Sequence, residues 1–265
     1  MWLMRFFAVL LLVGPLAFAQ TDELELGRRD YKQNRYDSAI QHFKNAAAAD
    51  PSNKEPHLCL ATAWAQQYIP GVDTPDNKQL GAEAISEYEK VLDLDPNSIA
   101  SIKGIAYLYL QMKDFETSKS YYKKAVDLSP EDSESYYSLG VIDWTQAYQP
   151  RMQLRARLGL KPVQSMIYTP QCWEVRDRNQ EIIREGMDVL TEALRLQPEY
   201  DDAMAYINLM YRERADIQCG DPQSSRADLK AADKWVELTI ASKQRKAERG
   251  SKVENSNQTT SDRNR

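Results

Sequence analysis

The sequence predicts an all-α protein in which about five helix hairpins stack into a solenoid. Two observations predict this fold: prolines close apolar helical segments at related intervals, and small and large residues recur at fixed distances from each proline. The composition agrees, because 42% hydrophobic and 28% charged residues are typical of globular domains. With 265 residues, the chain can form one large domain or two modest ones.

The prolines give the repeat length. Pro51, Pro96, Pro130 and Pro198 follow apolar helical segments, at intervals of 45, 34 and 68 residues. The second interval is 34, the third is twice 34, and the first exceeds 34 by 11. Because proline stops a helix, a hairpin of 34 residues recurs here with insertions.

Small and large side chains mark where the two helices of each hairpin cross. Twelve, eight and five residues before the prolines, the sequence has Ala39, Phe43, Ala46; Ala84, Tyr88, Val91; Ser118, Tyr122, Ala125; and Gly186, Leu190, Ala193. Nine and ten residues after them it has Leu60-Ala61, Ile105-Ala106, Leu139-Gly140 and Ile207-Asn208, and Leu26-Gly27 occupies the same place in the first hairpin. A small residue lets two helices approach closely, and the large one fills the groove beside it.

At these residues the chain resembles the tetratricopeptide repeat (TPR) family. The resemblance covers residues 20–242 and implies a right-handed superhelical solenoid of about five TPR helix hairpins. The hairpin units begin near Gln20, Lys54, Ile99, Ser133 and Asp201. Members of the family share a scaffold rather than a chemistry, so the resemblance implies a binding protein and no particular reaction.

Insertions interrupt hairpin units two, four and five. They span about residues 68–78, 149–180 and 218–224, and the longest contains the basic residues Arg151, Arg155, Arg157 and Lys161. Thr169-Pro170 resembles a helix N-cap followed by proline in the first turn. Ser225 with Asp228 resembles a capping box, so we expect the last helix to open there.

Residues 1–19 are predicted to be a secretory signal peptide. Arg5 precedes an apolar segment that ends in Ala17-Phe18-Ala19, and about 13 apolar residues are too few to span a bilayer. The alternative is an uncleaved N-terminal anchor, although Gly14-Pro15 interrupts the apolar segment. We therefore expect a periplasmic or secreted protein with no membrane span after signal removal.

Residues 243–265 are predicted to be a disordered basic tail. They hold seven Lys or Arg and three Asp or Glu with no aromatic residue, so they can bury little apolar surface. The whole chain has a net charge of −5 and lacks a dominant basic block, which argues against nucleic acid as a partner.

No catalytic or metal-binding motif is present in the sequence. His42 and His57 have no metal-ligand partner at helical spacing, and the phosphate-loop, nucleophile-elbow, HExxH and CxxC patterns are all absent. Acidic pairs such as Asp201-Asp202 follow prolines at helix starts, where they suit the helix dipole. We expect no enzyme activity and no cofactor.

Three cysteines leave at least one thiol unpaired. Cys59 adjoins the core-facing Leu60 and Ala61, whereas Cys172 and Cys219 both lie in insertions. Continuous antiparallel helices would leave those two about 10 Å apart along the axis. A disulfide needs Cα atoms within about 7 Å, so one element must unwind. The sequence is compatible with a Cys172–Cys219 disulfide and, alternatively, with two free thiols at these positions.

The candidate binding residues follow from the resemblance, which implies that the first helix of each unit lines a concave groove. The partner-binding candidates on that stripe are Arg28, Tyr31, Lys103, Tyr107, Tyr137, Trp144 and Arg212. Alternatively, the long insertion after Trp144 folds back over the groove and buries Tyr107, Tyr137 and Trp144 within the chain. Aromatic and arginine side chains are common anchors of protein interfaces.

These features lead to two hypotheses about function. The first is an exported, non-enzymatic scaffold that binds a protein or peptide partner in the cell envelope during assembly or secretion. The second is an accessory subunit of an envelope enzyme complex, or an enzyme with its site in the 149–180 insertion.

We predict that the exported protein begins at Gln20, because small residues at Ala17 and Ala19 fit a signal peptidase. Intact mass spectrometry of the exported product checks this. A mass that includes residues 1–19 would contradict it.

Overall fold

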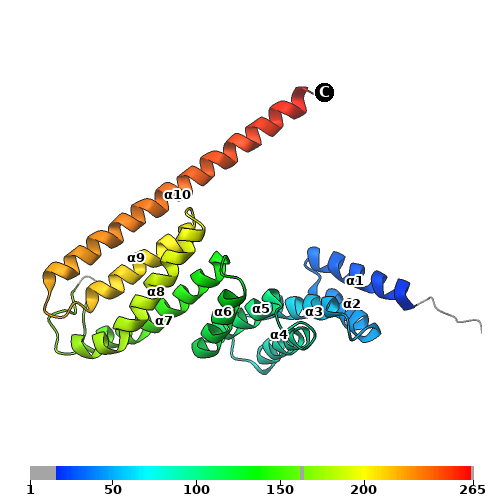
Figure 1. Ribbon diagram of the computed structural model, residues 1–265, viewed down its shortest axis with the longest axis horizontal. Coiled ribbons are helices and arrows are strands. Elements are labelled where there is room, and N and C mark those ends of the chain that lie inside the picture. Colours follow the sequence, from blue (N-terminus) through cyan, green and yellow to red (C-terminus); the bar gives the residue numbers. More distant parts are fainter. Residues whose placement is uncertain (1–15, 162–163, 264–265) are drawn as a thin grey trace, which may run out of the picture. The chain divides into compact units, whose positions relative to one another are not determined.

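The fold is all-α in every part of the chain that the structure describes. The structure is a computed structural model that describes the backbone of residues 16–161 and 164–263 and the side chains of 23–161 and 164–250. Ten helices and no strand occur in these residues, which confirms the predicted fold class (Figure 1). The predicted signal peptide lies outside the described residues, except for residues 16–19 at the start of the first helix.

The helices fall into two compact bodies. The N-terminal body, residues 1–112, contains the first five helices, and the C-terminal body, residues 113–265, contains the other five. The helices are α1 (Leu16–Lys32), α2 (Tyr36–Ala49), α3 (Lys54–Gln67), α4 (Pro75–Leu94), α5 (Ile99–Gln111), α6 (Phe115–Leu128), α7 (Ser133–Arg157), α8 (Cys172–Leu196), α9 (Asp201–Asp216) and α10 (Pro222–Arg263).

Glycine contacts hold the helix crossings of the N-terminal body together. Consecutive helices from α1 to α5 pack on one another, and α3 also contacts α1 and α5. A Cβ atom on Gly27 would meet the Phe43 ring at 2.5 Å, and one on Gly104 would overlap the Tyr88 ring. Phe43 and Tyr88 are two of the large residues that the sequence pattern singled out, so this pattern marks the crossings as predicted.

Close contacts between a glycine and a large side chain also hold helices together in the C-terminal body. Consecutive helices from α6 to α10 pack on one another, and α7 also contacts α9. A Cβ atom on Gly140 of α7 would overlap Leu190 of α8, which is fully buried. The largest core of this body gathers around Leu190, Ile207 and Met210. The first helices α7 and α9 therefore lie next to each other in space, although α8 separates them in sequence.

Helix starts agree closely with the sequence pattern. Helices α3, α5, α7 and α9 begin at Lys54, Ile99, Ser133 and Asp201, the residues predicted to open hairpin units. The local sequence supplies caps at several ends: the Asn53 side chain accepts from the N–H of Glu55, and that of Asp114 accepts from the N–H of Thr117.

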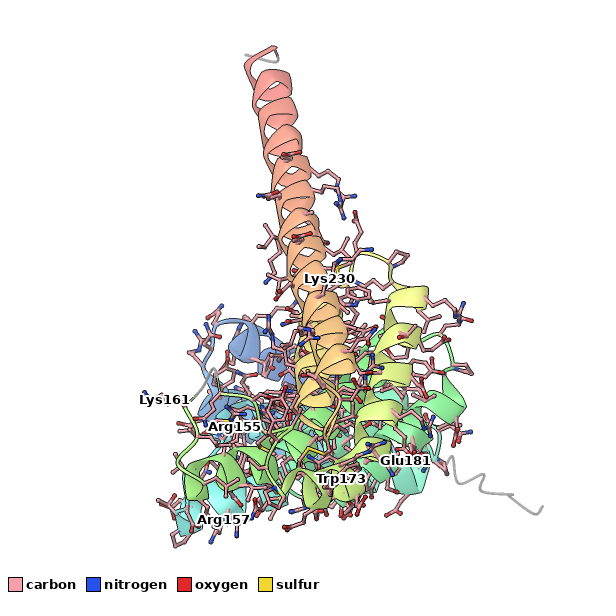
Figure 2. All side chains as sticks on the ribbon, turned by 90° about the vertical axis from the view of Figure 1, so that its left-hand side faces the viewer. Arg155, Arg157, Lys161, Trp173, Glu181 and Lys230 are labelled. Atoms are coloured by element: carbon pink, nitrogen blue, oxygen red, sulfur yellow. A yellow bond between two sulfur atoms is a disulfide. The ribbon has the colours of Figure 1, made fainter. Side chains whose placement is uncertain are left out.

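The longest insertion mostly lengthens two helices. Helix α7 continues through Pro150 to Arg157, and α8 starts at Cys172, two residues after the predicted first-turn proline Pro170. Arg157 and Lys161 are exposed near the end of α7 (Figure 2). The insertion thus extends the α7–α8 hairpin beyond the length of the repeat.

The capping box predicted at Ser225 and Asp228 is wrong. Helix α10 opens earlier, at Pro222, because the Asp221 carboxylate accepts hydrogen bonds from the N–H groups of Gln223 and Ser224. Asp228 instead accepts from Arg214 of α9. Its carboxylate ties α10 to α9 rather than capping a helix.

The basic segment predicted to be a disordered tail is helical in the structure. Helix α10 continues through residues 243–263 without a break. Lys243 and Lys246 pair with Asp201, and Arg245 and Arg249 pair with Glu199. A helix that already exists extends without a new nucleation step, so few apolar residues are needed. Exposed ion pairs of this kind add little each, typically under about 1 kcal/mol.

Within residues 16–161 and 164–263, no helix combines the length and the apolar character that a membrane crossing requires.

Candidate functional site

The first candidate site is a pocket between α1, α2 and α3 of the N-terminal body. Predicted binding residues Arg28 and Tyr31 of α1 line it, opposite Leu58 and Thr62 of α3. The pocket has a volume of about 360 Å³. The stripe predicted to face a ligand therefore does enclose a hollow in this body.

An ion pair crosses this pocket from helix to helix. The Arg28 guanidinium donates to the Glu55 carboxylate of α3. The Nε atom of Arg28 is buried and has no hydrogen-bond acceptor among the described residues. Phe43 and the free thiol of Cys59 also line the pocket, and burial raises the pKa of that thiol. Apolar walls and a charged rim can hold a side chain of a peptide.

Two further candidates lie on α5, away from this pocket. The side chain of Tyr107 is 48% exposed, whereas Lys103 is half-buried. Ile105 and Ala106 between them face the core of the body. Tyr107 is therefore accessible on the surface, as predicted for a ligand-facing position.

Tyr137 and Trp144 of α7 are covered by rings from their own body. Tyr137 lies 4.9 Å from the Tyr200 ring and 5.6 Å from the Tyr206 ring, measured between centroids. Trp144 stacks on Tyr148 at 4.7 Å and meets Tyr206 edge-on at 5.4 Å. Both predicted binding residues are half-buried and pack on the core of the C-terminal body, with the rings of Tyr148, Tyr200 and Tyr206 against them.

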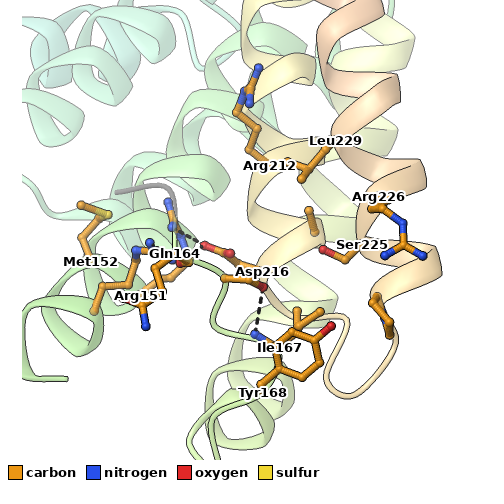
Figure 3. A pocket seen from close by; sticks show the side chains of 14 residues that line it. Arg151, Met152, Gln164, Ile167, Tyr168, Arg212, Asp216, Ser225, Arg226 and Leu229 are labelled. Atoms are coloured by element: carbon orange, nitrogen blue, oxygen red, sulfur yellow. Dashed lines mark hydrogen bonds and ion pairs between the residues drawn. The ribbon is translucent and has the colours of Figure 1, made fainter. Parts of the chain in front are cut away.

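Arg212, the last binding candidate, lines a different pocket in the C-terminal body. This pocket has a volume of about 600 Å³ and lies among the ends of α7 and α9, the insertion loop and the start of α10 (Figure 3). Arg212 pairs there with Asp233 of α10. The structure thus separates Arg212 from the aromatic residues with which the sequence grouped it.

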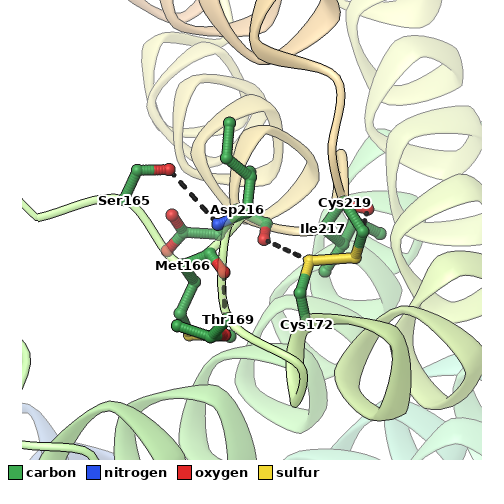
Figure 4. The surroundings of a disulfide bond; sticks show 8 residues. Ser165, Met166, Thr169, Cys172, Asp216, Ile217 and Cys219 are labelled. Atoms are coloured by element: carbon green, nitrogen blue, oxygen red, sulfur yellow. Dashed lines mark hydrogen bonds between the residues drawn. A yellow bond between two sulfur atoms is a disulfide. The ribbon is translucent and has the colours of Figure 1, made fainter.

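A disulfide lies beside this second pocket. Cys172 at the start of α8 is bonded to Cys219 in the α9–α10 loop, with Cα atoms 5.7 Å apart (Figure 4). The loop at Gly220 unwinds with φ of +72°, and its N–H donates to the carbonyl of Ile167. This unwinding brings the two cysteines closer than continuous helices would.

Comparison with known proteins identifies the repeat. Residues 27–67 match the TPR repeat family and residues 104–132 match the tetratricopeptide repeat family. MamA from Desulfovibrio magneticus RS-1 superimposes with a TM-score of 0.56 at 15% identity, over 84% of this chain and 98% of that one. Residues 27–67 and 104–132 are tetratricopeptide repeats.

Two other matches are a solved structure and a curated protein. YrrB, described as a TPR protein with an unusual peptide-binding site, superimposes with a TM-score of 0.53 at 12% identity, over 87% of this chain and 98% of YrrB. The protein CTR9 homolog of Arabidopsis thaliana is 32% identical over 59 residues, or 22% of this chain. The match spans only 5% of the plant protein.

The TPR pattern did not reveal two clusters of buried charge. Arg151 and Arg155 of α7 reach Glu213 and Asp216 of α9, with Arg151 Nε 2.5 Å from Glu213 Oε2. The only signal for this first cluster in the sequence was spacing: the two arginines lie four residues apart and the two acids three residues apart, which places each pair on one face of a helix. In the second cluster, Lys119 Nζ lies 2.7 Å from Asp143 Oδ1 and also binds Glu185.

The described residues hold no cluster of three or more His, Cys, Asp or Glu side chains that could bind a metal ion. His42 and His57 each bond instead to a glutamate: His42 Nδ1 lies 2.8 Å from Glu23 Oε2, and His57 Nδ1 lies 2.7 Å from Glu87 Oε2.

We predict that replacing Tyr137 and Trp144 with alanine lowers the free energy of unfolding of the C-terminal body by about 3 to 5 kcal/mol, because both rings pack on its core. Denaturant titration measures the change. Tyr107→Ala, which removes an exposed ring, serves as the control and should change stability by under about 0.5 kcal/mol. A double variant as stable as the control would mean that the two rings are not structural.

Asp143 should make stability depend on pH. Burial raises its pKa to about 6, although Lys119 opposes the shift. Between pH 4 and 6 the folded state then holds more protons than the unfolded state, so stability falls as pH rises through this window. A pKa shift of two units changes the free energy of unfolding by at most about 3 kcal/mol.

Asp143→Asn should remove this dependence. The free energy of unfolding should be measured for both proteins at pH 4, 5, 6 and 7. The value for the variant minus that for the wild type should increase by about 2 to 3 kcal/mol from pH 4 to pH 7. Parallel stability curves for the two proteins would refute the assignment.

We predict that replacing Cys172 and Cys219 with serine lowers the free energy of unfolding by about 2 to 4 kcal/mol. The disulfide joins residues 47 positions apart, and without it the unfolded chain gains conformational entropy. Non-reducing peptide mapping of the wild type should find these two cysteines linked and Cys59 free. Alkylation of all three thiols in the native protein would exclude the bond.

Proposed function

We propose that the chain is an exported, non-enzymatic scaffold that binds a protein or peptide partner in the cell envelope. The observation that carries this proposal is the pocket of the N-terminal body. Side chains from successive turns of α1 and α3 converge there on one hollow. That arrangement suits a side chain of a partner better than it suits covalent chemistry.

The chemistry of the pocket is that of a recognition site. Leu58 and Phe43 supply apolar walls, and Arg28, Lys32 and Glu55 supply charge. Protein interfaces combine an apolar centre with a polar rim in this way. Lys32 is exposed and forms no ion pair within the described residues, so its charge is available to a partner.

Two further observations support the proposal. YrrB, which shares the fold, is described as having a peptide-binding site. The Cys172–Cys219 disulfide suits an oxidising compartment such as the periplasm or the cell exterior. Together with the predicted signal peptide at residues 1–19, it favours an exported protein.

An enzyme with its site in the 149–180 insertion is the alternative. The insertion does line a pocket, but Arg151 and Arg155 hold the nearby carboxylates of Glu213 and Asp216 in ion pairs. Carboxylates paired in this way suit a structural role better than acid–base catalysis.

Affinity capture from a cell-envelope extract tests the proposal. The full exported chain should retain a specific protein, and Lys32→Glu should reduce its recovery at least about tenfold, as expected when an interface charge is reversed. Lys124→Glu makes the same charge change on the exposed surface of α6 and should retain the partner. Equal recovery with both variants would contradict binding at this pocket.

A further inference from the structure

The pocket of the C-terminal body is a second candidate site, built largely from insertions. Its lining comes from the end of α7, residues 164–168 of the insertion, the end of α9 and the first turns of α10. A volume of about 600 Å³ lies within the range of typical ligand sites.

The floor of the pocket is rigid and electrically balanced. Arg151 and Arg155 are buried, and so is Glu213, while Asp216 bonds to both arginines. Arg155 also donates at 2.7 Å to the carbonyls of Lys161 and Gln164, which ties these two residues of the insertion to α7. Two positive and two negative charges thus cancel at the floor.

Two arginines lie at the mouth of the pocket, each with one acidic residue nearby. Arg226 of α10 is exposed and forms no ion pair among the described residues. Asp221 is the acid near it, but both Asp221 oxygens already accept hydrogen bonds at the start of α10. Arg212 pairs with Asp233, whose side chain is 69% exposed. An exposed pair of this kind is weak, so a ligand can compete for Arg212.

Apolar side chains surround these arginines. Met152, Tyr168 and Leu229 all line the pocket and are all unusually exposed, with Tyr168 at 71%. Figure 3 shows Leu229 and Tyr168 on two sides of the pocket, with Arg226 on α10 and Arg212 on α9 extending in different directions. Exposed apolar groups gathered at one hollow mark an interaction site more often than single exposed ones do.

The disulfide holds this opening in shape. The Cys172–Cys219 disulfide joins the start of α8 to the α9–α10 loop (Figure 4). The N–H of Gly220 in that loop also donates to the carbonyl of Ile167. A site whose walls are fixed before binding loses less entropy when a ligand arrives.

We infer that this pocket binds an acidic peptide segment of a partner protein, with one carboxylate at Arg226, a second at Arg212, and a neighbouring apolar side chain against Tyr168, Met152 and Leu229. The floor is neutral, so only these two arginines are available. Two cations suit two carboxylates of a peptide better than a nucleic acid, which needs many cations along its backbone.

Fluorescence anisotropy with the full chain tests this inference. The probe is a fluorescein-labelled peptide with the central sequence glutamate-leucine-glutamate-phenylalanine between glycine–serine flanks. Arg226→Gln should weaken binding about tenfold, the loss expected for one desolvated charge contact. Replacing both glutamates of the probe with glutamine should weaken it at least as much.

Lys230→Gln is the matched control, because Lys230 lies one turn further along α10, is exposed and does not line the pocket (Figure 2). It should leave affinity within about twofold, whereas Tyr168→Ala should weaken binding at least about fivefold. No binding at about 1 mM probe, equal affinity for the glutamine probe, or equal losses with Lys230→Gln and Arg226→Gln would each overturn the inference.

Lys32→Glu, which alters the pocket of the N-terminal body, should leave binding of this probe unchanged. If this variant also abolished binding, the probe would be occupying the other pocket, and the inference would fail while the proposed function stood.

Discussion

The contact between a small residue on one helix and a large side chain on the next is the constraint on which the rest of the structure depends. Gly27 receives Phe43, Gly104 receives Tyr88, and Gly140 receives Leu190, each at a distance that leaves no room for a Cβ atom. Because the backbones approach so closely there, the rotation of each helix about its axis is fixed. The residues on the opposite stripe are then set toward the inner face, where α1 and α3 form the pocket of the N-terminal body.

The insertions add a second level of structure to this scaffold. They lengthen α7 and α8 beyond the repeat, and the extra turns carry their own interactions: buried ion pairs from Arg151 and Arg155 to α9, and a disulfide from Cys172 to the α9–α10 loop. Repeat contacts alone would leave the extended ends without partners. The charged network and the disulfide supply them, and they create a pocket whose chemistry differs from that of the inner face.

Much of the fold could be predicted from the sequence, because hairpin packing needs particular residue sizes at short, fixed spacings. The starts of α3, α5, α7 and α9 follow from that pattern. Side-chain partners across long separations could not be predicted: Arg151 and Glu213 lie 62 residues apart, and Tyr137 packs on Tyr206 of α9. The helix over residues 243–263 was also missed; ion pairs from Lys246 and Arg249 to Asp201 and Glu199 join its first turns to residues far back in the sequence.

A double-mutant cycle on Gly140 and Leu190 tests the central constraint most directly. Alanine normally stabilises a helix by about 1 kcal/mol relative to glycine. We expect Gly140→Ala nevertheless to destabilise the wild-type C-terminal body, because the new Cβ atom meets Leu190, and to become neutral or stabilising in the Leu190→Ala background. The coupling free energy from denaturant unfolding should then be about 1 to 3 kcal/mol. Stabilisation by Gly140→Ala of similar size in both backgrounds would show that the close approach of α7 and α8 does not determine the fold.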